Sequence, residues 1–347
     1  MPDLQSQFLK KETPFDFAEA VAEARRDYPK ETANITFFDL ASPEVEKEIA
    51  AFAEKANLNG RQYDALLEKV ENKRAVATEM NGFRIVAVAS AGEGDMQSFP
   101  GDEYKSAYFA FQHELGHFVV KDAQGLSGRA EDYKEHAADT FAVIRGLQAG
   151  VLKKSDLLAL SDKRGQEMLM SMDFAHMTSM SLDAIAINPK NIDFLSLSKQ
   201  DIAKVAQRHA NTFESTGKTF SKFSALQNGN GCTIPDGSLR HDVIDRKLDQ
   251  LLDIAMSAPA DSQEFYLAAR VLNNVLETGK LRWAPFEHTV DVSTDHWREA
   301  HKALLAKAGD RDIGAKKAHK SVSLHRPGEE PKNLVARIAE GIKPLKI

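Results

Sequence analysis

The chain has 347 residues, of which 42% are hydrophobic and 28% charged, and this composition predicts a soluble globular protein of one large domain or two ordinary ones. The formal net charge of −6 argues against general nucleic-acid binding. The segment 311–347 holds nine Lys or Arg and four Asp or Glu, so it carries +5 and the remainder carries −11. We interpret this basic tail as solvated and extended, with docking or sorting roles as alternatives.

The only cysteine, Cys232, excludes an intrachain disulfide as the source of stability. The N-terminal stretch 1–15 lacks an apolar core of the kind that secretory signals have, and no stretch approaches 18 apolar residues. We therefore expect no membrane span and a cytoplasmic location, with export by a signal-less route left open.

The N-terminal part alternates helical and strand patterns. Residues 15–28 have helical spacing, and the apolar run 34–40 is a candidate strand. A second helix is expected at 42–58, with Ser42 as N-cap and Pro43 at the first helical position. Residues 82–90, GFRIVAVAS, form the strongest strand pattern in the chain.

Helices dominate the rest of the chain. A loop with three Gly and one Pro follows the strand at 82–90, and two helices then cover about 103–121 and 130–149. Irregular connections are expected at 226–238 and 280–294. Further helical patterns follow at 154–172, 199–213, 239–257, 262–278 and 294–308, with a short one at 333–341.

This order of elements predicts an α+β fold with a small mixed sheet, followed by a mainly α-helical C-terminal half. We place an N-terminal part at 1–150, a helical part at 151–310 and the basic tail at 311–347.

The helix at 103–121 contains the sequence His113-Glu114-Leu115-Gly116-His117. Residues four apart lie on one face of a helix, so both imidazoles can point at one ion, and imidazole is a good zinc ligand. Glu114 is rotated by about 100° from His113, which puts its carboxylate beside the water rather than among the ligands. One helical turn therefore supplies two zinc ligands and a general base.

The alternative interpretation is an ordinary amphipathic helix that carries two histidines. A chain of this composition would contain about 0.03 such motifs by chance. The flanking residues are apolar, and two imidazoles buried without partners would cost several kcal/mol. A bound metal removes this cost.

A third ligand should come from a nearby helix, and Glu135 and Asp139 are again four residues apart. With these residues the sequence resembles the zincin metallopeptidases, and among them the glutamate-ligand group, the gluzincins. That group combines His-Glu-x-x-His with Glu-x-x-x-Asp on a following helix. HELGH at 113–117 and EHAAD at 135–139 look most like its bacterial cytoplasmic or membrane-associated members.

The resemblance implies one zinc ion per chain, with His113, His117 and Glu135 as ligands. It implies Glu114 as the base that activates the water, and Asp139 as a hydrogen-bond acceptor that fixes a ligand histidine. It also implies that the strand at 82–90 is an edge strand that pairs with an extended peptide. The resemblance covers residues 80–145 and does not extend to the C-terminal half.

The family also uses a His or Tyr from its C-terminal part to stabilise the oxyanion. The candidates are His176, His209, His241 and Tyr266, and we favour His176, with packing among methionines as the alternative. His136 follows Glu135 and points to another face. We expect His136 on the surface, and it is the alternative third ligand.

We therefore expect a zinc metallopeptidase that hydrolyses peptides or proteins. The alternative is a non-catalytic regulatory or binding protein with a zinc-stabilised zincin fold. Glu114 favours the enzyme, because a scaffold does not need a base beside its metal.

Overall fold

The computed structural model describes residues 14–71, 74–91, 98–99, 101–123, 131–170, 175–188, 192–215, 217–224, 226, 232, 240–283 and 286–309. Two compact units divide the chain, and neither is continuous in sequence. Unit 1 comprises Met1–Arg129, Phe141–Leu152 and Phe194–Gln207, and unit 2 comprises Ala130–Thr140, Lys153–Asp193 and Arg208–Ile347. The expected division at residue 150 with a separate tail stays a prediction.

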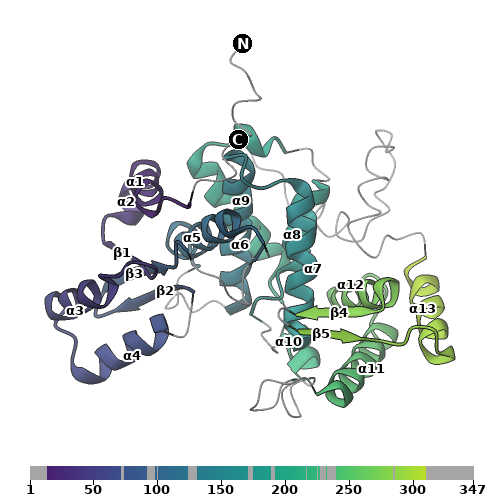
Figure 1. Cartoon of the computed structure of the whole chain (residues 1–347). Helices are drawn as coiled ribbons and strands as arrows, with labels where there is room; N and C mark the ends of the chain where they lie inside the picture. The colour runs from purple at the N-terminus through teal and green to yellow at the C-terminus, as the bar shows by residue number, and fades with distance from the viewer. Residues whose placement is uncertain are drawn as a thin grey trace. The chain divides into compact units, whose positions relative to one another are not determined.

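Unit 1 contains a small sheet and the helices around it (Figure 1). Two longer helices, α6 (Glu131–Gln148) and α9 (Lys199–Phe213), contribute one part to each unit. The remaining elements of unit 1 are α1 (Phe17–Asp27), α2 (Pro29–Thr32), β1 (Ile35–Asp39), α3 (Val45–Lys55), α4 (Gly60–Glu71), β2 (Ala75–Met80), β3 (Phe83–Val88), α5 (Glu103–Val119) and the 3-10 turn η2 (Phe194–Ser196).

The sheet of unit 1 has the strand order β1-β3-β2. β1 is parallel to β3, with Phe37 opposite Val86, and β2 is antiparallel to β3, with Ala77 opposite Val86. β3 is therefore the central strand. The expectation that the strand at 82–90 forms an edge is wrong, because both of its sides are already hydrogen-bonded. The edges of this sheet are β1 and β2.

Side chains alternate between the two faces of the sheet. Ile85 and Ala87 of β3 join a core formed with α3 and α4, in which Phe52 and Leu66 are buried. On the other face α5 contacts β3 and β2, and the Phe37 ring of β1 stacks on Phe111 of α5 at 5.9 Å between centroids. The sheet thus supports α5, the helix that carries the two candidate ligand histidines.

Unit 2 is mostly helical. One core cluster joins side chains of α7, α8, α11, α12 and α13. Helix α12 begins where the Ser262 hydroxyl accepts a hydrogen bond from the Phe265 amide, and it ends at Gly279, whose φ is 68°. The elements of unit 2 are α7 (Lys154–Met170), α8 (Ser179–Ile187), α10 (Gly217–Ser224), α11 (His241–Ser257), α12 (Gln263–Thr278), β4 (Lys280–Trp283), β5 (Phe286–Thr289) and α13 (Asp295–Ala308).

The coarse α+β assignment is confirmed, since a small sheet accompanies a predominantly helical chain. The long helices that were expected lie within two residues of their expected bounds, apart from the one at 42–58, and α4 was not expected. The helix expected from residue 42 instead begins at Val45, and Ser42 accepts a hydrogen bond from the amide of Glu44. The connection expected at 280–294 contains the antiparallel pair β4–β5.

Most of the loop expected at 226–238, and the basic tail, lie outside the described residues. In the described part of the chain, no helix has the length and apolar character needed to cross a membrane.

Candidate metal centre

Helix α5 places His113 and His117 one turn apart. The helix starts where the Asp102 carboxylate accepts a hydrogen bond from the Lys105 amide at 3.0 Å. The two imidazole centroids are 5.0 Å apart, and the ring planes are nearly perpendicular at 86°. His113 is only 6% exposed, although it sits on a helix whose other residues are mostly apolar. Both rings thus occupy one sheltered face of α5.

The backbone after α5 orients His117. Its Nδ1 lies 3.1 Å from the carbonyl oxygen of Ala123. A carbonyl oxygen only accepts hydrogen bonds, so Nδ1 carries the proton and the neutral ring has its lone pair on Nε2. This is the usual arrangement of a metal-ligating histidine, in which the second nitrogen donates to a carbonyl or carboxylate.

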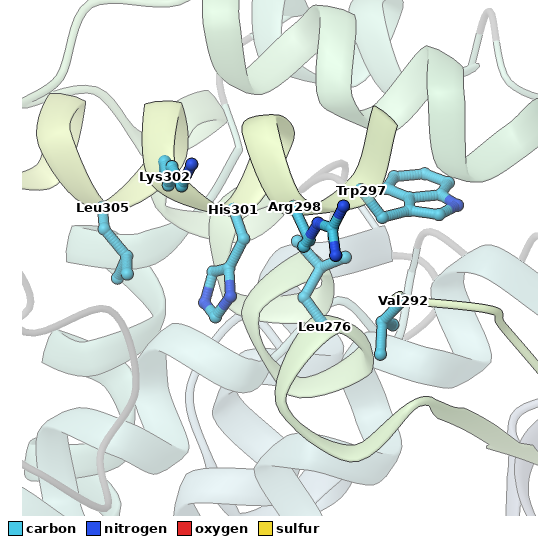
Figure 2. A pocket seen from close by; sticks show the side chains of 7 residues that line it. All are labelled: Leu276, Val292, Trp297, Arg298, His301, Lys302 and Leu305. Carbon is cyan, nitrogen blue, oxygen red and sulfur yellow. The ribbon is translucent and has the colours of Figure 1, made fainter. Parts of the chain in front are cut away.

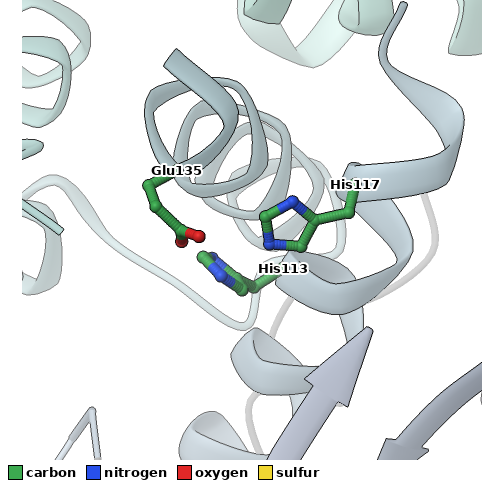
Figure 3. A group of neighbouring side chains, drawn as sticks. All are labelled: His113, His117 and Glu135. Atoms are coloured by element: carbon green, nitrogen blue, oxygen red, sulfur yellow. The ribbon is translucent and has the colours of Figure 1, made fainter. Parts of the chain in front are cut away.

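Glu135 of α6 joins the two histidines. One ligand atom from each of His113, His117 and Glu135 lies within 4.8 Å of the others. Figure 3 shows the Glu135 carboxylate directed toward the two imidazole rings. Two imidazole nitrogens and one carboxylate oxygen form a donor set suited to zinc, and three protein ligands leave a position for water or substrate. The three residues therefore fit a catalytic type of zinc site.

Glu114 lies between the two histidines in sequence and is 9% exposed. Within the described part of the chain its carboxylate takes part in no hydrogen bond or ion pair. It is therefore available to accept a proton.

Asp139, one turn after Glu135, is fully buried. Its carboxylate accepts two hydrogen bonds from Arg164, at 2.9 and 3.0 Å, and one from the Thr178 hydroxyl at 2.5 Å. Burial alone lowers the pKa of Arg164, but the Asp139 carboxylate more than offsets this and the pKa is raised. Sequence reasoning named neither Arg164 nor Thr178, and the expected bond from Asp139 to a ligand histidine stays a prediction.

His176, the favoured oxyanion donor, lies beside the third ligand. Its Nε2 is 3.0 Å from Oε2 of Glu135, and its side chain is 29% exposed. It therefore does not pack fully within the methionine-rich core. The two groups are within ion-pair distance of each other.

His136 is not on the surface as expected. It is 1% exposed, and its Nδ1 lies 2.7 Å from the Ser181 hydroxyl. Burial lowers the pKa of His136 to about 4, against the opposing effect of Asp132, Asp139 and Glu135. The physical reason for the error is that α6 is buried on all sides from Asp132 to Arg145, so it has no solvent face there.

The other three candidate donors have partners or neighbours of their own in unit 2. Tyr266 is fully buried and donates its hydroxyl hydrogen to Asp183. His209 is 6% exposed and packs beside Phe213, and His241 begins α11 with its Nδ1 2.6 Å from Nδ1 of His288.

Two surface pockets are formed by other residues. One in unit 1, of about 680 Å³, is lined by the start of α1 and by β1. One in unit 2, of about 240 Å³, has apolar walls that include Leu276, Val292 and Trp297, with Arg298 and Lys302 beside them (Figure 2). Both cations already pair with carboxylates of α13. Neither pocket contains a residue of the candidate metal centre.

Comparison with protein-family models, with curated proteins and with solved structures finds no significant match to this chain. The resemblance to zincins therefore rests on the two motifs and on the convergence of their side chains.

Proposed function

We propose that this chain is a zinc metallopeptidase. The observation that carries the proposal is the convergence of His113, His117 and Glu135, with ligand atoms within 4.8 Å of one another. Glu114 follows His113 on the same helix. Zinc held there supplies a Lewis acid that polarises the scissile carbonyl and lowers the pKa of water toward ~7.

The chain's own residues would divide the remaining work. His113 and His117 hold the ion through ring nitrogens, and the Ala123 carbonyl keeps the His117 lone pair on Nε2. Glu135 adds one negative charge to the site. Glu114 takes the proton of the attacking water and passes it to the leaving amine. A carboxylate can play both parts because it is ionised at neutral pH and regains its charge after each transfer.

The substrate would be a peptide in extended conformation. The central position of β3 removes it as a pairing partner, whereas β2 is an edge strand whose residues contact α5. An edge strand can hold a peptide through main-chain hydrogen bonds, which every peptide sequence offers.

The test compares Glu114→Gln with the unmodified protein. We expect unchanged zinc content by elemental analysis and unchanged circular dichroism. Hydrolysis of a mixed peptide library should fall at least ~10²-fold, the usual effect of removing a general base. Glu103→Gln changes an exposed carboxylate in the first turn of the same helix and should retain full activity. If Glu114→Gln retained full hydrolysis, the proposed mechanism would be contradicted. Zinc binding without any hydrolysis in the unmodified protein would favour the non-catalytic alternative.

A further inference from the structure

Residues 175–178, which precede α8, and the first turn of α8 contact helix α6 at several points. His176 lies 3.0 Å from Glu135, Thr178 donates to Asp139 at 2.5 Å, and Ser181 lies 2.7 Å from His136. The two acidic residues are four apart on α6, and the two residues that contact them are two apart in the connection. The chain that leads into α8 therefore packs against the helix that carries the third candidate ligand.

Arg164 of α7 completes this arrangement. Its guanidinium contacts both oxygens of Asp139 and, through Nη1, also Glu167 at 3.1 Å. A two-pronged guanidinium–carboxylate pair fixes orientation as well as distance, which a lysine cannot do. Because Asp139 is fully buried, its carboxylate would be strongly destabilised without this partner. The pair thus fixes α6 against α7 one turn beyond Glu135.

We infer that His176, Thr178 and Arg164 form a positioning clamp for Glu135, which sets the affinity of the centre for its metal. The inference rests on the metal centre proposed above. His176 lies within ion-pair distance of the Glu135 carboxylate and would limit the positions that this side chain can take. Thr178 and Arg164 fix the next turn of α6 through Asp139. None of the three belongs to the group of converging ligand atoms.

Without the clamp, the Glu135 side chain would sample several rotamers, and binding an ion would require it to be ordered first. Partners of this kind around metal ligands change metal affinity by about 10–100-fold when they are removed. The clamp also competes with the role expected for His176 from the family resemblance. Nε2 of His176 cannot lie against Glu135 and against a developing oxyanion at the same time.

The test measures zinc affinity by competition with a chromophoric chelator, using the full chain. His176→Leu removes the donor at similar volume, and His176→Gln restores an N–H near the position of Nε2. We expect about 10–100-fold weaker zinc binding for His176→Leu and recovery to within about threefold for His176→Gln. His301→Leu, in which the lost imidazole contacts Asn273 of unit 2, is the matched control and should bind zinc like the unmodified protein.

A second pair of variants tests the other half of the clamp. Thr178→Val removes one hydroxyl at constant shape. Arg164→Lys keeps the positive charge but cannot make the two-pronged contact with the Asp139 carboxylate. Both should weaken zinc binding and change the visible spectrum of the cobalt-substituted protein, while circular dichroism stays unchanged. A purely structural role would not alter the cobalt spectrum of a folded variant.

Three outcomes would overturn the inference. First, His176→Leu could have the same zinc affinity and the same cobalt spectrum as the unmodified protein, which would show that no clamp acts on Glu135. Second, lower peptide hydrolysis in His176→Leu at unchanged zinc affinity would assign His176 to the oxyanion instead. Third, zinc could still bind to His117→Ala. This result would contradict the proposed metal centre, and therefore the clamp as well, and it can be distinguished from the other two results.

Discussion

Arg145 is a buried cation of unit 1 whose partners both come from α1. Its side chain is 3% exposed, and Nη2 lies 2.6 Å from Glu23 and 2.8 Å from Asp27. Two carboxylates that converge on one buried guanidinium repel each other once the cation is removed. Arg145 therefore joins α1 to the C-terminal half of α6.

We predict that Arg145→Ala lowers the free energy of unfolding by about 3 kcal/mol, the lower end of the range for breaking a buried ion pair, since Glu23 is partly exposed. The measurement is urea denaturation followed by circular dichroism. Arg246→Ala is the control. It breaks an exposed pair with Asp242 in α11 and should change stability by no more than about 0.5 kcal/mol. Equal losses in the two variants would contradict the prediction.

At the residue scale, helical spacing was sufficient to predict that His113 and His117 share one face, whereas the approach of Glu135 was expected from the family resemblance of the second motif. Arg164 and Thr178 could not be found in this way. They lie 25 and 39 residues after Asp139, and their contacts depend on how α7 and the α7–α8 connection pack. The burial of His136 was missed for a related reason, because one sequence does not say whether a helix is covered on one side or on all sides.

At the scale of elements, Gly146 allows α6 to turn closely into the following segment. A Cβ at this position would lie 2.5 Å from Cδ1 and 2.6 Å from Cγ of Leu152. Leu152 is 3% exposed, so its side chain has little room to move away. We predict that Gly146→Ala destabilises the chain by about 1–2 kcal/mol, because overpacking outweighs the better helix propensity of alanine.

Gly60 provides the control for this prediction. It begins α4, and a Cβ there would meet nothing within 4 Å. Gly60→Ala should therefore leave the thermal midpoint unchanged or raise it slightly. If Gly146→Ala also raised the midpoint, the close approach of Leu152 would not be a constraint on α6.

The strands were predicted less accurately than most of the helices. β2 was missed, although Asn81 and Gly82, both with positive φ, mark a two-residue turn that joins it to β3. The position of β3 in the sheet was misjudged, although its uninterrupted apolar run is typical of a strand covered on both faces. β4 and β5 have four residues each, too few to show a period. Most long amphipathic helices were predicted closely, whereas the 12-residue helix α4 was missed.

At the scale of the whole molecule, the sequence suggested one boundary between the folded parts, at residue 150, whereas the chain crosses between its two units several times. Residues Phe194–Gln207 belong to unit 1 although helices of unit 2 precede and follow them. Helix propensity and capping act over neighbouring residues, so they predict where α9 begins and ends but not which core it joins. Tyr28 of α1, for example, donates a hydrogen bond to the carbonyl of Lys199, 171 residues later.

A metal bound by α5 and α6 should stabilise the folded chain. A ligand that binds only the folded state adds RT ln(1 + [L]/Kd), or about 2.7 kcal/mol when free zinc is 100 times Kd. We predict that zinc raises the thermal midpoint by about 5 °C, that the rise continues with the logarithm of the zinc concentration, and that EDTA reverses it.

Magnesium at the same concentration should have no such effect, because it prefers oxygen ligands to imidazole. In His117→Ala the zinc effect should largely disappear, since one of the three ligands is lost. An equal rise in that variant would mean that zinc stabilises the chain from another site.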